Sequence, residues 1–190
     1  PVIHRETVGV FAGLIKLASV FGGKVNIGRA RGFIPEGSSR QMTEKRFIET
    51  MREICDIAGQ YNVEMILEPV NRYEINFINS VDEGAAVLEQ VGRTNCGLQP
   101  DVFHMNIEDD DIGKSLMRNK KWIRYVHLAD SNRYAPGMGH IDFQGVFDAL
   151  RMADYDGWVS VEILPGEDPD KMAKTSIQYL KPLIQQYNKS

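Results

Sequence analysis

The sequence predicts an α/β protein, a (β/α)8 barrel of parallel strands to which this chain contributes about five βα units. Two observations lead to this prediction. Short apolar runs of strand-like length alternate with longer segments in which apolar residues recur at helical spacing. In addition, four of the runs end at an acidic or imidazole side chain: Glu68, Asp101, His127 and Glu162. One rim of a parallel barrel is where this fold collects its functional groups.

The first part of the chain provides two helices and two strands in alternation. Val8 to Phe21 has apolar residues at helical spacing and ends at two glycines, which predicts a helix and its stop. Lys24 to Gly28 follows as a short strand. Thr43 can cap the next helix, and the strand that ends at Glu68 comes after it. The expected inner face of that second helix consists of Phe47, Met51, Ile54 and Ala58.

The alternation continues to the end of the sequence. The remaining helices are expected at about Val81–Val91, Ile112–Asn119, Gln144–Ala153 and Pro169–Tyr187, with strands ending at Asp101, His127 and Glu162 between them. Strands that alternate with helices imply right-handed crossovers and a parallel sheet covered on both faces. No linker or low-complexity stretch interrupts the pattern, so residues 1–190 are expected to form a single domain.

The number of strands conflicts with a complete barrel. Five strands are predicted here, whereas a closed (β/α)8 barrel has eight and uses roughly 250 residues. Five strands of an open barrel would leave two unpaired sheet edges. Either three N-terminal strand units are missing from this chain, or the five strands form an open doubly wound sheet. The chemistry of the strand ends favours the first interpretation, an N-terminally incomplete barrel.

Composition narrows the class of protein. The 190 residues are 43% hydrophobic and 25% charged, as in a well-packed globular domain. A net charge of -4 argues against a surface that binds nucleic-acid phosphates. Two cysteines are too few for a disulfide framework and fit a reducing compartment. No apolar run approaches the ~20 residues that span a bilayer, and no leader pattern is present, so a cytoplasmic protein is expected.

The four strand-end side chains suit a divalent cation. Three carboxylates and one imidazole form a hard, oxygen-rich set that favours Mn²⁺, Mg²⁺ or Co²⁺ over a thiol-seeking ion. A single divalent cation would offset most of their combined charge. The alternative is that each residue faces water or caps a helix, which would be the better interpretation for any one of them alone. Four such residues after consecutive strands favour the metal site.

Three charged or imidazole residues in the following loops are candidates for binding substrate. Arg133 lies six residues beyond a candidate metal ligand, in a loop rich in Pro and Gly, and either holds a substrate oxygen or is a surface cation. His104 either binds substrate or is a satisfied strand-end histidine. Glu74 either binds substrate or pairs with Arg72.

Other polar loop residues carry weaker signals. Asn71 and Asn132 either stabilise their loops or bind ligand, with equal weight. His140 lies in the loop rich in Pro and Gly, where a role in the loop itself is the stronger interpretation.

Several motifs resemble those of a known family. They are Glu68-Pro-Val-Asn-Arg-Tyr-Glu74, Asp101-Val-Phe-His-Met-Asn-Ile-Glu108, Asn132-Arg133 with Pro136-Gly-Met-Gly139, and Tyr155-Asp-Gly157 before the last strand. From about Val8 to Tyr187 the chain resembles the xylose isomerase-like TIM-barrel superfamily, and within it the ketose 3-epimerases that act on D-tagatose and D-psicose. The segments Ala129–Arg133 and Gly139–Phe143 are more similar to the branch that contains 5-keto-L-gluconate epimerases.

The resemblance implies roles by position. Glu68, Asp101, His127 and Glu162 match the metal ligands, with Mn²⁺ the expected ion. Glu68 and Glu162 also match the acid/base pair, and the residues that match the substrate-binding positions are Glu74, His104 and Arg133. The five strands then correspond to strands four to eight of the barrel, and the missing first three include an aromatic part of the substrate pocket. The family also implies a homo-oligomer, either a dimer or a tetramer, with a small sugar as its partner.

The implied reaction is epimerisation of a ketose or keto sugar acid through an enediolate, with two glutamates as acid and base. An aldose–ketose isomerase similar to hydroxypyruvate isomerase, or an inosose dehydratase, would use similar ligands. An inactive fragment or a binding module is the alternative outside the enzymes. A DNA-repair nuclease of the endonuclease IV type needs a histidine-rich site with several zinc ions, and the four histidines and acidic balance of this chain disfavour it.

Overall fold

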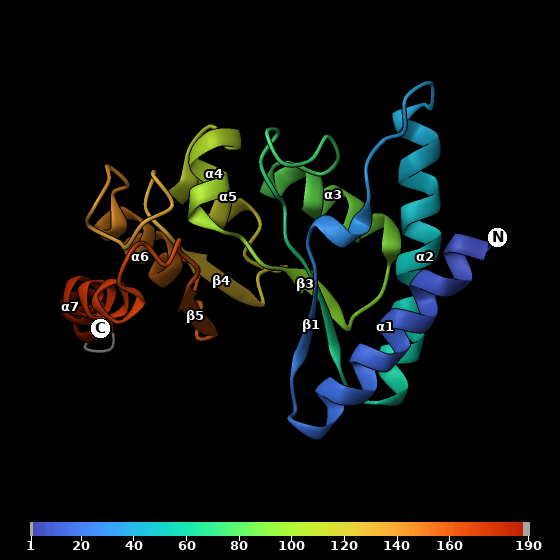
Figure 1. Ribbon diagram of the computed structural model, residues 1–190, viewed down its shortest axis with the longest axis horizontal. Helices are drawn as coiled ribbons and strands as arrows, with labels where there is room; N and C mark the ends of the chain where they lie inside the picture. The colour runs from blue at the N-terminus through green and yellow to red at the C-terminus, as the bar shows by residue number, and fades with distance from the viewer. Residues whose placement is uncertain (1, 188–190) are drawn as a thin grey trace. The chain divides into compact units, whose positions relative to one another are not determined.

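In this computed structural model the chain is described from residue 2 to residue 187. It forms two compact units, residues 1–99 and residues 100–190, which we call unit 1 and unit 2. Helices and strands alternate along the chain, as the sequence predicts, except that two short helices follow one another directly in unit 2 (Figure 1). The α/β class is confirmed, whereas the single domain remains a prediction. Among the described helices, none has the length and apolarity needed to cross a membrane.

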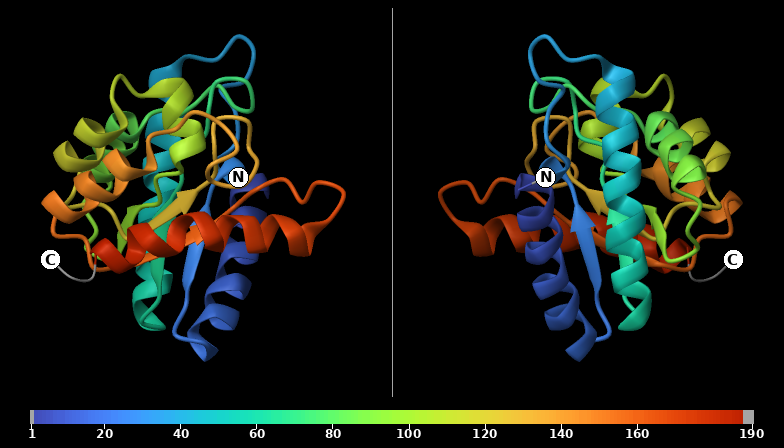
Figure 2. Two further views of the ribbon diagram at one scale, coloured as in Figure 1. Left: turned by 90° about the vertical axis from the view of Figure 1, so that its left-hand side faces the viewer. Right: turned by 90° about the vertical axis from the view of Figure 1, so that its right-hand side faces the viewer.

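Unit 1 is a parallel three-stranded sheet with helices packed against it. The strands β1 (Lys24–Ile27), β2 (Glu64–Leu67) and β3 (Cys96–Leu98) are hydrogen-bonded in that order. Both strand pairs are parallel, with Lys24 opposite Glu64 and Met65 opposite Cys96. The helices are α1 (Val2–Val20), the short 3-10 helix η1 (Arg29–Arg31), α2 (Arg40–Gln60) and α3 (Val81–Val91). Helices α1 and α2 run side by side (Figure 2).

Helix α2 starts earlier than its sequence pattern predicts. Ser39, not Thr43, is its N-cap: the Ser39 hydroxyl accepts a hydrogen bond from the backbone N–H of Met42. The prediction for Thr43 was wrong because its hydroxyl donates to the carbonyl of Ser39 within the first turn. The predicted inner face is confirmed, since Phe47, Met51, Ile54 and Ala58 are all buried.

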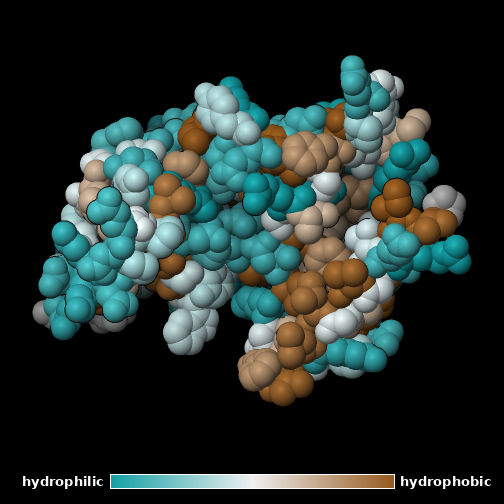
Figure 3. All heavy atoms as spheres, viewed as in Figure 1, coloured by the Kyte–Doolittle hydropathy of each residue, from teal (hydrophilic) through white to brown (hydrophobic). Residues whose placement is uncertain are grey.

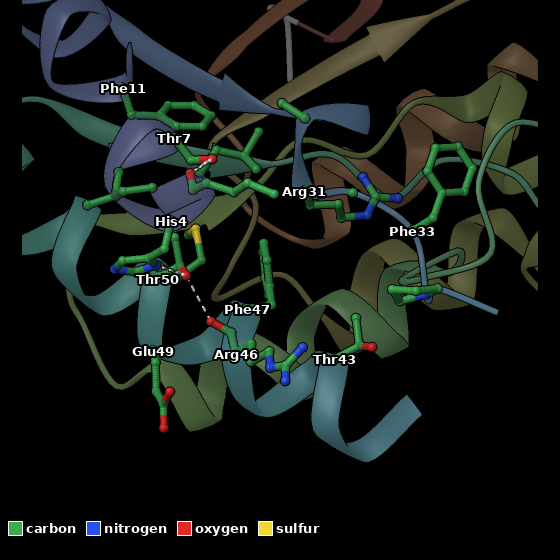
Figure 4. A pocket seen from close by; sticks show the side chains of 17 residues that line it. His4, Thr7, Phe11, Arg31, Phe33, Thr43, Arg46, Phe47, Glu49 and Thr50 are labelled. Atoms are coloured by element: carbon green, nitrogen blue, oxygen red, sulfur yellow. Dashed lines mark hydrogen bonds between the residues drawn. The ribbon is translucent and has the colours of Figure 1, made fainter. Parts of the chain in front are cut away.

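Helix α1 buries one apolar stripe and exposes another. Its buried side chains are Val8, Phe11 and Ile15. The exposed apolar residues of this helix and of the turn after it gather into a patch on the surface (Figure 3); they include Val10, Leu14, Leu17, Val20 and Phe21. A cavity of about 840 Å³ lies between α1, α2 and the segment that follows β1 (Figure 4).

Unit 2 contains the parallel pair β4 (Tyr125–Leu128) and β5 (Trp158–Val161), in which Tyr125 pairs with Trp158. Asp101 adds an isolated parallel bridge to His127 in β4. The helices are α4 (Val102–Glu108), α5 (Ile112–Arg118), α6 (Phe143–Met152) and α7 (Pro169–Tyr187), and α6 packs against both α5 and α7. Helix α4, which follows Asp101 directly, is not predicted by the sequence pattern.

Candidate metal centre

Three of the four predicted metal ligands meet in unit 2. Asp101 and His127 are bridge partners in adjacent extended segments. Glu162 follows β5 directly, and its backbone N–H donates to the carbonyl of Leu128 at the end of β4, 3.2 Å away. Asp101, His127 and Glu162 each offer one ligand atom, and these atoms lie within 4.8 Å of one another. Parallel pairing therefore brings together three side chains that span 61 positions of the sequence, from 101 to 162.

The His127 imidazole favours the ionised form of Glu162. Atom Nδ1 of His127 lies 3.4 Å from Oε2 of Glu162. This hydrogen bond, with the nearby charges of Arg133 and His104, lowers the pKa of Glu162 to about 2, although partial burial of the carboxyl group acts in the opposite direction. Glu162 is therefore a carboxylate at any physiological pH, the form that binds a cation.

Arg133 reaches both carboxylates of this cluster. Its Nη1 donates to Oδ2 of Asp101 at 2.7 Å, and its Nη2 donates to the carboxylate of Glu162. The guanidinium also lies over the ring of Phe103, with its central carbon 4.6 Å from the ring centroid. Arg133 is thus paired with two of the predicted metal ligands, and its role in binding substrate stays a prediction.

The backbone around Arg133 is tightly held. Arg133 has a φ of +64°, in the left-handed region that non-glycine residues rarely adopt. Its N–H donates to the carbonyl of Asp130 at 2.8 Å, and its own carbonyl accepts from the N–H of Leu164 at the same distance. These bonds fix the direction in which the side chain leaves the loop.

Asp130 organises this loop and was missed from the sequence. Its buried carboxylate accepts backbone N–H bonds from Ser131 at 2.8 Å, Gly137 at 2.8 Å and Ile141 at 3.1 Å. A Cβ on Gly139 would collide with the Asp130 carboxylate, so glycine is required there. An aspartate two residues after a strand and ahead of a loop rich in Pro and Gly was the available signal.

His104 lies on α4 and is buried, so it does not end a strand as one interpretation held. Its Nε2 is 3.4 Å from Nη1 of Arg133 and 3.9 Å from Oδ2 of Asp101. Asp101 is the N-cap of that same helix, through a 3.0 Å bond from the N–H of Phe103 to its Oδ1. One carboxylate therefore caps α4, bonds Arg133 and faces the imidazole.

The fourth predicted ligand, Glu68, belongs to unit 1. It follows β2 directly, and its N–H donates to the carbonyl of Ile27 in β1 at 3.3 Å. Oε2 of the Glu68 carboxylate accepts from the Asn26 side chain at 3.1 Å. The strand-end position predicted for Glu68 is confirmed.

Glu74 also belongs to unit 1, on the loop after β2. Its Oε1 accepts from the side chain of Asn71 at 3.2 Å, and its Oε2 lies 3.6 Å from Nη1 of Arg29. Asn71 accepts from the N–H of Tyr73 in an Asx turn, and Asn132 does the same for Tyr134 in unit 2. The loop-stabilising interpretation is therefore confirmed for both asparagines.

The donor set of unit 2 fits a hard divalent cation. Two carboxylates and an imidazole offer oxygen and nitrogen atoms close enough to share one ion, and no thiol is among them. Cys55 and Cys96 are free and buried in unit 1, where mutual hydrogen bonding and burial raise the pKa of the Cys55 thiol. The set therefore favours Mn²⁺, Mg²⁺ or Co²⁺ by its chemistry.

Comparison with known proteins identifies the family of the chain. Residues 3–183 match the protein family described as Xylose isomerase-like TIM barrel. The chain is 36% identical over 147 residues to an L-ribulose 3-epimerase of Methylomonas sp. (strain DH-1). This match covers 77% of this chain and 51% of that protein. It is 31% identical over 138 residues to a 3-dehydro-D-guloside 4-epimerase of Escherichia coli (strain K12), covering 72% and 53%.

The fold agrees with solved structures as well. The crystal structure of a D-allulose 3-epimerase from Methylomonas sp. superposes with a TM-score of 0.85 and 27% sequence identity, covering 94% of this chain and 70% of that chain. The resemblance and the TIM-barrel class expected from the sequence are confirmed. The chain spans about half the length of the curated relatives it matches.

Proposed function

Because the chain belongs to the xylose isomerase-like TIM barrel family, we propose that it works as a divalent-metal-dependent epimerase or isomerase of a ketose or keto sugar acid. The names of two relatives, an L-ribulose 3-epimerase and a 3-dehydro-D-guloside 4-epimerase, support a sugar substrate. The observation that carries the proposal is the cluster of Asp101, His127 and Glu162, to which Arg133 donates from a rigid loop.

We assign the metal to Asp101, His127 and Glu162 of unit 2 together with Glu68 of unit 1. The hard donor atoms favour Mn²⁺, with Mg²⁺ and Co²⁺ as alternatives. When bound, such a cation supplies Lewis-acid stabilisation for negative charge that develops on substrate oxygens.

We assign proton transfer to Glu68 and Glu162. The proton next to a ketone is weakly acidic, and the enediolate left by its removal is planar. Inversion of that carbon therefore needs a base on one face and an acid on the other, and two glutamates meet this need. With a pKa of about 2, lowered chiefly by the hydrogen bond from His127 and further by the charge of Arg133, Glu162 is a weak base in this state. Transfer of the arginine to a substrate oxygen would remove one of these contributions and so raise the basicity of Glu162.

We assign substrate binding to Glu74, His104 and Arg133. Arg133 can present its planar fork of N–H donors to neighbouring oxygens of a sugar. His104 lies 3.4 Å from that guanidinium, which supports assigning the two side chains to adjacent oxygens of the sugar. Glu74 is 36% exposed at its side chain and can accept from sugar hydroxyls.

The test is exchange of the reacting proton. Glu68→Gln and Glu162→Gln each keep the shape of the side chain and remove its basicity. Ketoses are incubated with Mn²⁺ in D₂O, and deuterium uptake and product identity are followed by NMR. Each variant is expected to lose at least a hundredfold in rate. Glu167→Gln, which changes an exposed glutamate outside the cluster, is the matched control. Rates within a few-fold of wild type for both variants would reject the two-glutamate scheme.

The same NMR experiment separates the related reactions. An epimerase returns a ketose with one inverted carbon, an isomerase returns an aldose, and a dehydratase returns a product that has lost water. We also propose a cytoplasmic homo-oligomer, a dimer or tetramer, and light scattering coupled to size exclusion tests the oligomeric state.

A further inference from the structure

Arg31 in unit 1 is a buried arginine outside the residues assigned above. It ends η1, just after β1, and is 9% exposed. Arg31 lies among the side chains that line the cavity beside α1 and α2 (Figure 4). Its guanidinium makes four hydrogen bonds to backbone carbonyl oxygens: Nε to Phe77 at 2.7 Å, Nη1 to Gly28 at 2.7 Å and to Glu68 at 2.8 Å, and Nη2 to Ile78 at 2.7 Å.

These bonds tie three separate pieces of unit 1 together. Gly28 follows β1, Glu68 follows β2, and Phe77 and Ile78 end the loop that leads toward α3. Ile78 is fully buried and has a φ of +58°, a conformation that is strained for a β-branched residue. A strained residue persists only where its surroundings hold it, and the bond from Arg31 to the Ile78 carbonyl is part of that support.

The side chain of Glu68 is set from the other side by β1. The Asn26 amide donates to its Oε2 at 3.1 Å. A Cβ added to Gly28 would lie 3.2 Å from the same oxygen, which is tighter than an ordinary contact. The carboxylate is thus held by Asn26 in a space that Gly28 leaves open, while Arg31 holds the carbonyl of the same residue.

The charge of Arg31 belongs to this arrangement too. Burial lowers the pKa of Arg31 to about 10, and the carboxylates of Glu68 and Glu83 act in the opposite direction. Arg31 therefore remains a cation at neutral pH. Both carboxylates belong to unit 1, and Glu68 is also the residue whose backbone carbonyl Arg31 binds.

We infer that Arg31 is a positioning residue for Glu68. Its guanidinium fixes the backbone from which Glu68 projects and the loop from Pro69 to Ile78 that carries Glu74. This inference rests on the proposed function, because positioning matters only if Glu68 binds metal and transfers a proton. A lysine cannot replace the arginine, since one ammonium group has neither the reach nor the planar fork to serve four carbonyls.

The experiment compares Arg31→Met and Arg31→Lys with Arg52→Met. Arg52 is the matched control because it also donates to two backbone carbonyls of unit 1, those of Val91 at 3.2 Å and Gln90 at 2.6 Å, but at the end of α3. Three quantities are measured: Mn²⁺ affinity by calorimetry, hydrogen exchange of amides 69–78 by mass spectrometry, and kcat and KM for the ketose that the wild type converts.

Both Arg31 variants are expected to bind Mn²⁺ 10- to 100-fold more weakly, as when an outer partner of a metal ligand is lost. Their kcat should fall more than their KM changes, and amides 69–78 should exchange at least tenfold faster. Arg52→Met should stay within twofold of wild type in all of these. If Arg31→Met does not fold, Arg31→Lys is judged by the same criteria.

Two outcomes overturn the inference. One is Mn²⁺ affinity and kcat within twofold of wild type in a folded Arg31 variant. The other is unchanged exchange of amides 69–78. Failure of the wild type itself to bind Mn²⁺ or convert a ketose would instead reject the proposed function, and the exchange of amides 69–78 would then decide by itself whether Arg31 fixes the loop.

Discussion

Atom Nη1 of Arg133 lies 2.7 Å from Oδ2 of Asp101, whose side chain has no exposed surface. A buried carboxylate needs a charged or hydrogen-bonding partner, because desolvation of an unpaired charge is costly. Arg133 provides that partner from a loop 32 residues further along the chain. The conformation of the loop after β4 and the state of the carboxylate cluster are therefore coupled.

Removal of the Arg133 guanidinium should destabilise unit 2. Arg133→Met leaves Asp101 buried without its cation, and we expect a loss of about 3 kcal/mol in the free energy of unfolding, the usual effect of breaking a buried pair. Urea denaturation followed by circular dichroism measures it. Arg151→Met is the matched control, because Arg151 pairs with Asp148 on the surface of α6 at 2.7 Å and exposed pairs contribute less than about 1 kcal/mol. Equal losses in the two variants would contradict this coupling.

Divalent metal should stabilise the protein through His127. At a Mn²⁺ concentration 100 times the Kd, the free energy of unfolding should rise by about 2.7 kcal/mol, and a chelator should reverse the gain. His127→Ala should weaken Mn²⁺ binding by at least about tenfold. The control is His140→Ala, since His140 is bonded to Ser131 at 3.0 Å and is outside the ligand set. Thermal unfolding with and without Mn²⁺ measures both, and an identical metal-induced shift in His127→Ala and wild type would exclude His127 as a ligand.

The strand ends could be predicted from the sequence because each strand is short, apolar and followed by a polar residue. Glu68 and Glu162 follow β2 and β5 directly, as expected. His127 lies one residue inside β4, and Asp101 lies beyond β3 in an isolated bridge. Strand β4 continues to Leu128, one residue past His127. Strand β3 ends at Leu98, before Asp101 is reached.

Other features could not be predicted because their partners carry no sequence signature. Helix α4 has seven residues, too few for a periodic apolar pattern to stand out, and it begins at a cap, Asp101, that has other roles. Arg31 bonds backbone carbonyls, which every residue has. Thr43 and Ser39 are both good capping residues, and only the path of the preceding chain decides between them.

Asp130 should make stability depend on pH. Burial alone would raise the pKa of Asp130, but N–H bonds from Ile141, Ser131, Gly139 and Gly137 lower it overall. A carboxyl group whose pKa is lower in the folded state stabilises the protein above its ordinary pKa, near 4, and this contribution is lost as the pH falls toward the lower folded value. Asp130→Asn should therefore cost about 2 kcal/mol at pH 7 and progressively less below pH ~4.

Unfolding in urea at several pH values measures the difference between Asp130→Asn and wild type. Asp148→Asn, which changes an aspartate in a surface ion pair on α6, should differ from wild type by less than about 1 kcal/mol at pH 7. A cost for Asp130→Asn that is equally large at low and neutral pH would show that the ionised carboxylate is not what holds the loop.

Gly84 should be required for the packing of α3 against β3. A Cβ at this position would lie 2.8 Å from Cδ2 of Leu98 and 3.2 Å from Cγ of Pro69. Leu98 is fully buried and the proline ring is rigid, so neither can move aside cheaply. Overpacking of this kind costs about 1–3 kcal/mol, against a gain of about 1 kcal/mol for alanine in a helix. Gly84→Ala should therefore lose stability, by about 1 kcal/mol.

The matched control is Gly9→Ala in α1, where a Cβ meets nothing within 4 Å and only the helical gain remains. Urea denaturation should shift the two variants in opposite directions, and a stabilised Gly84→Ala would mean that α3 can move away from β3 without cost.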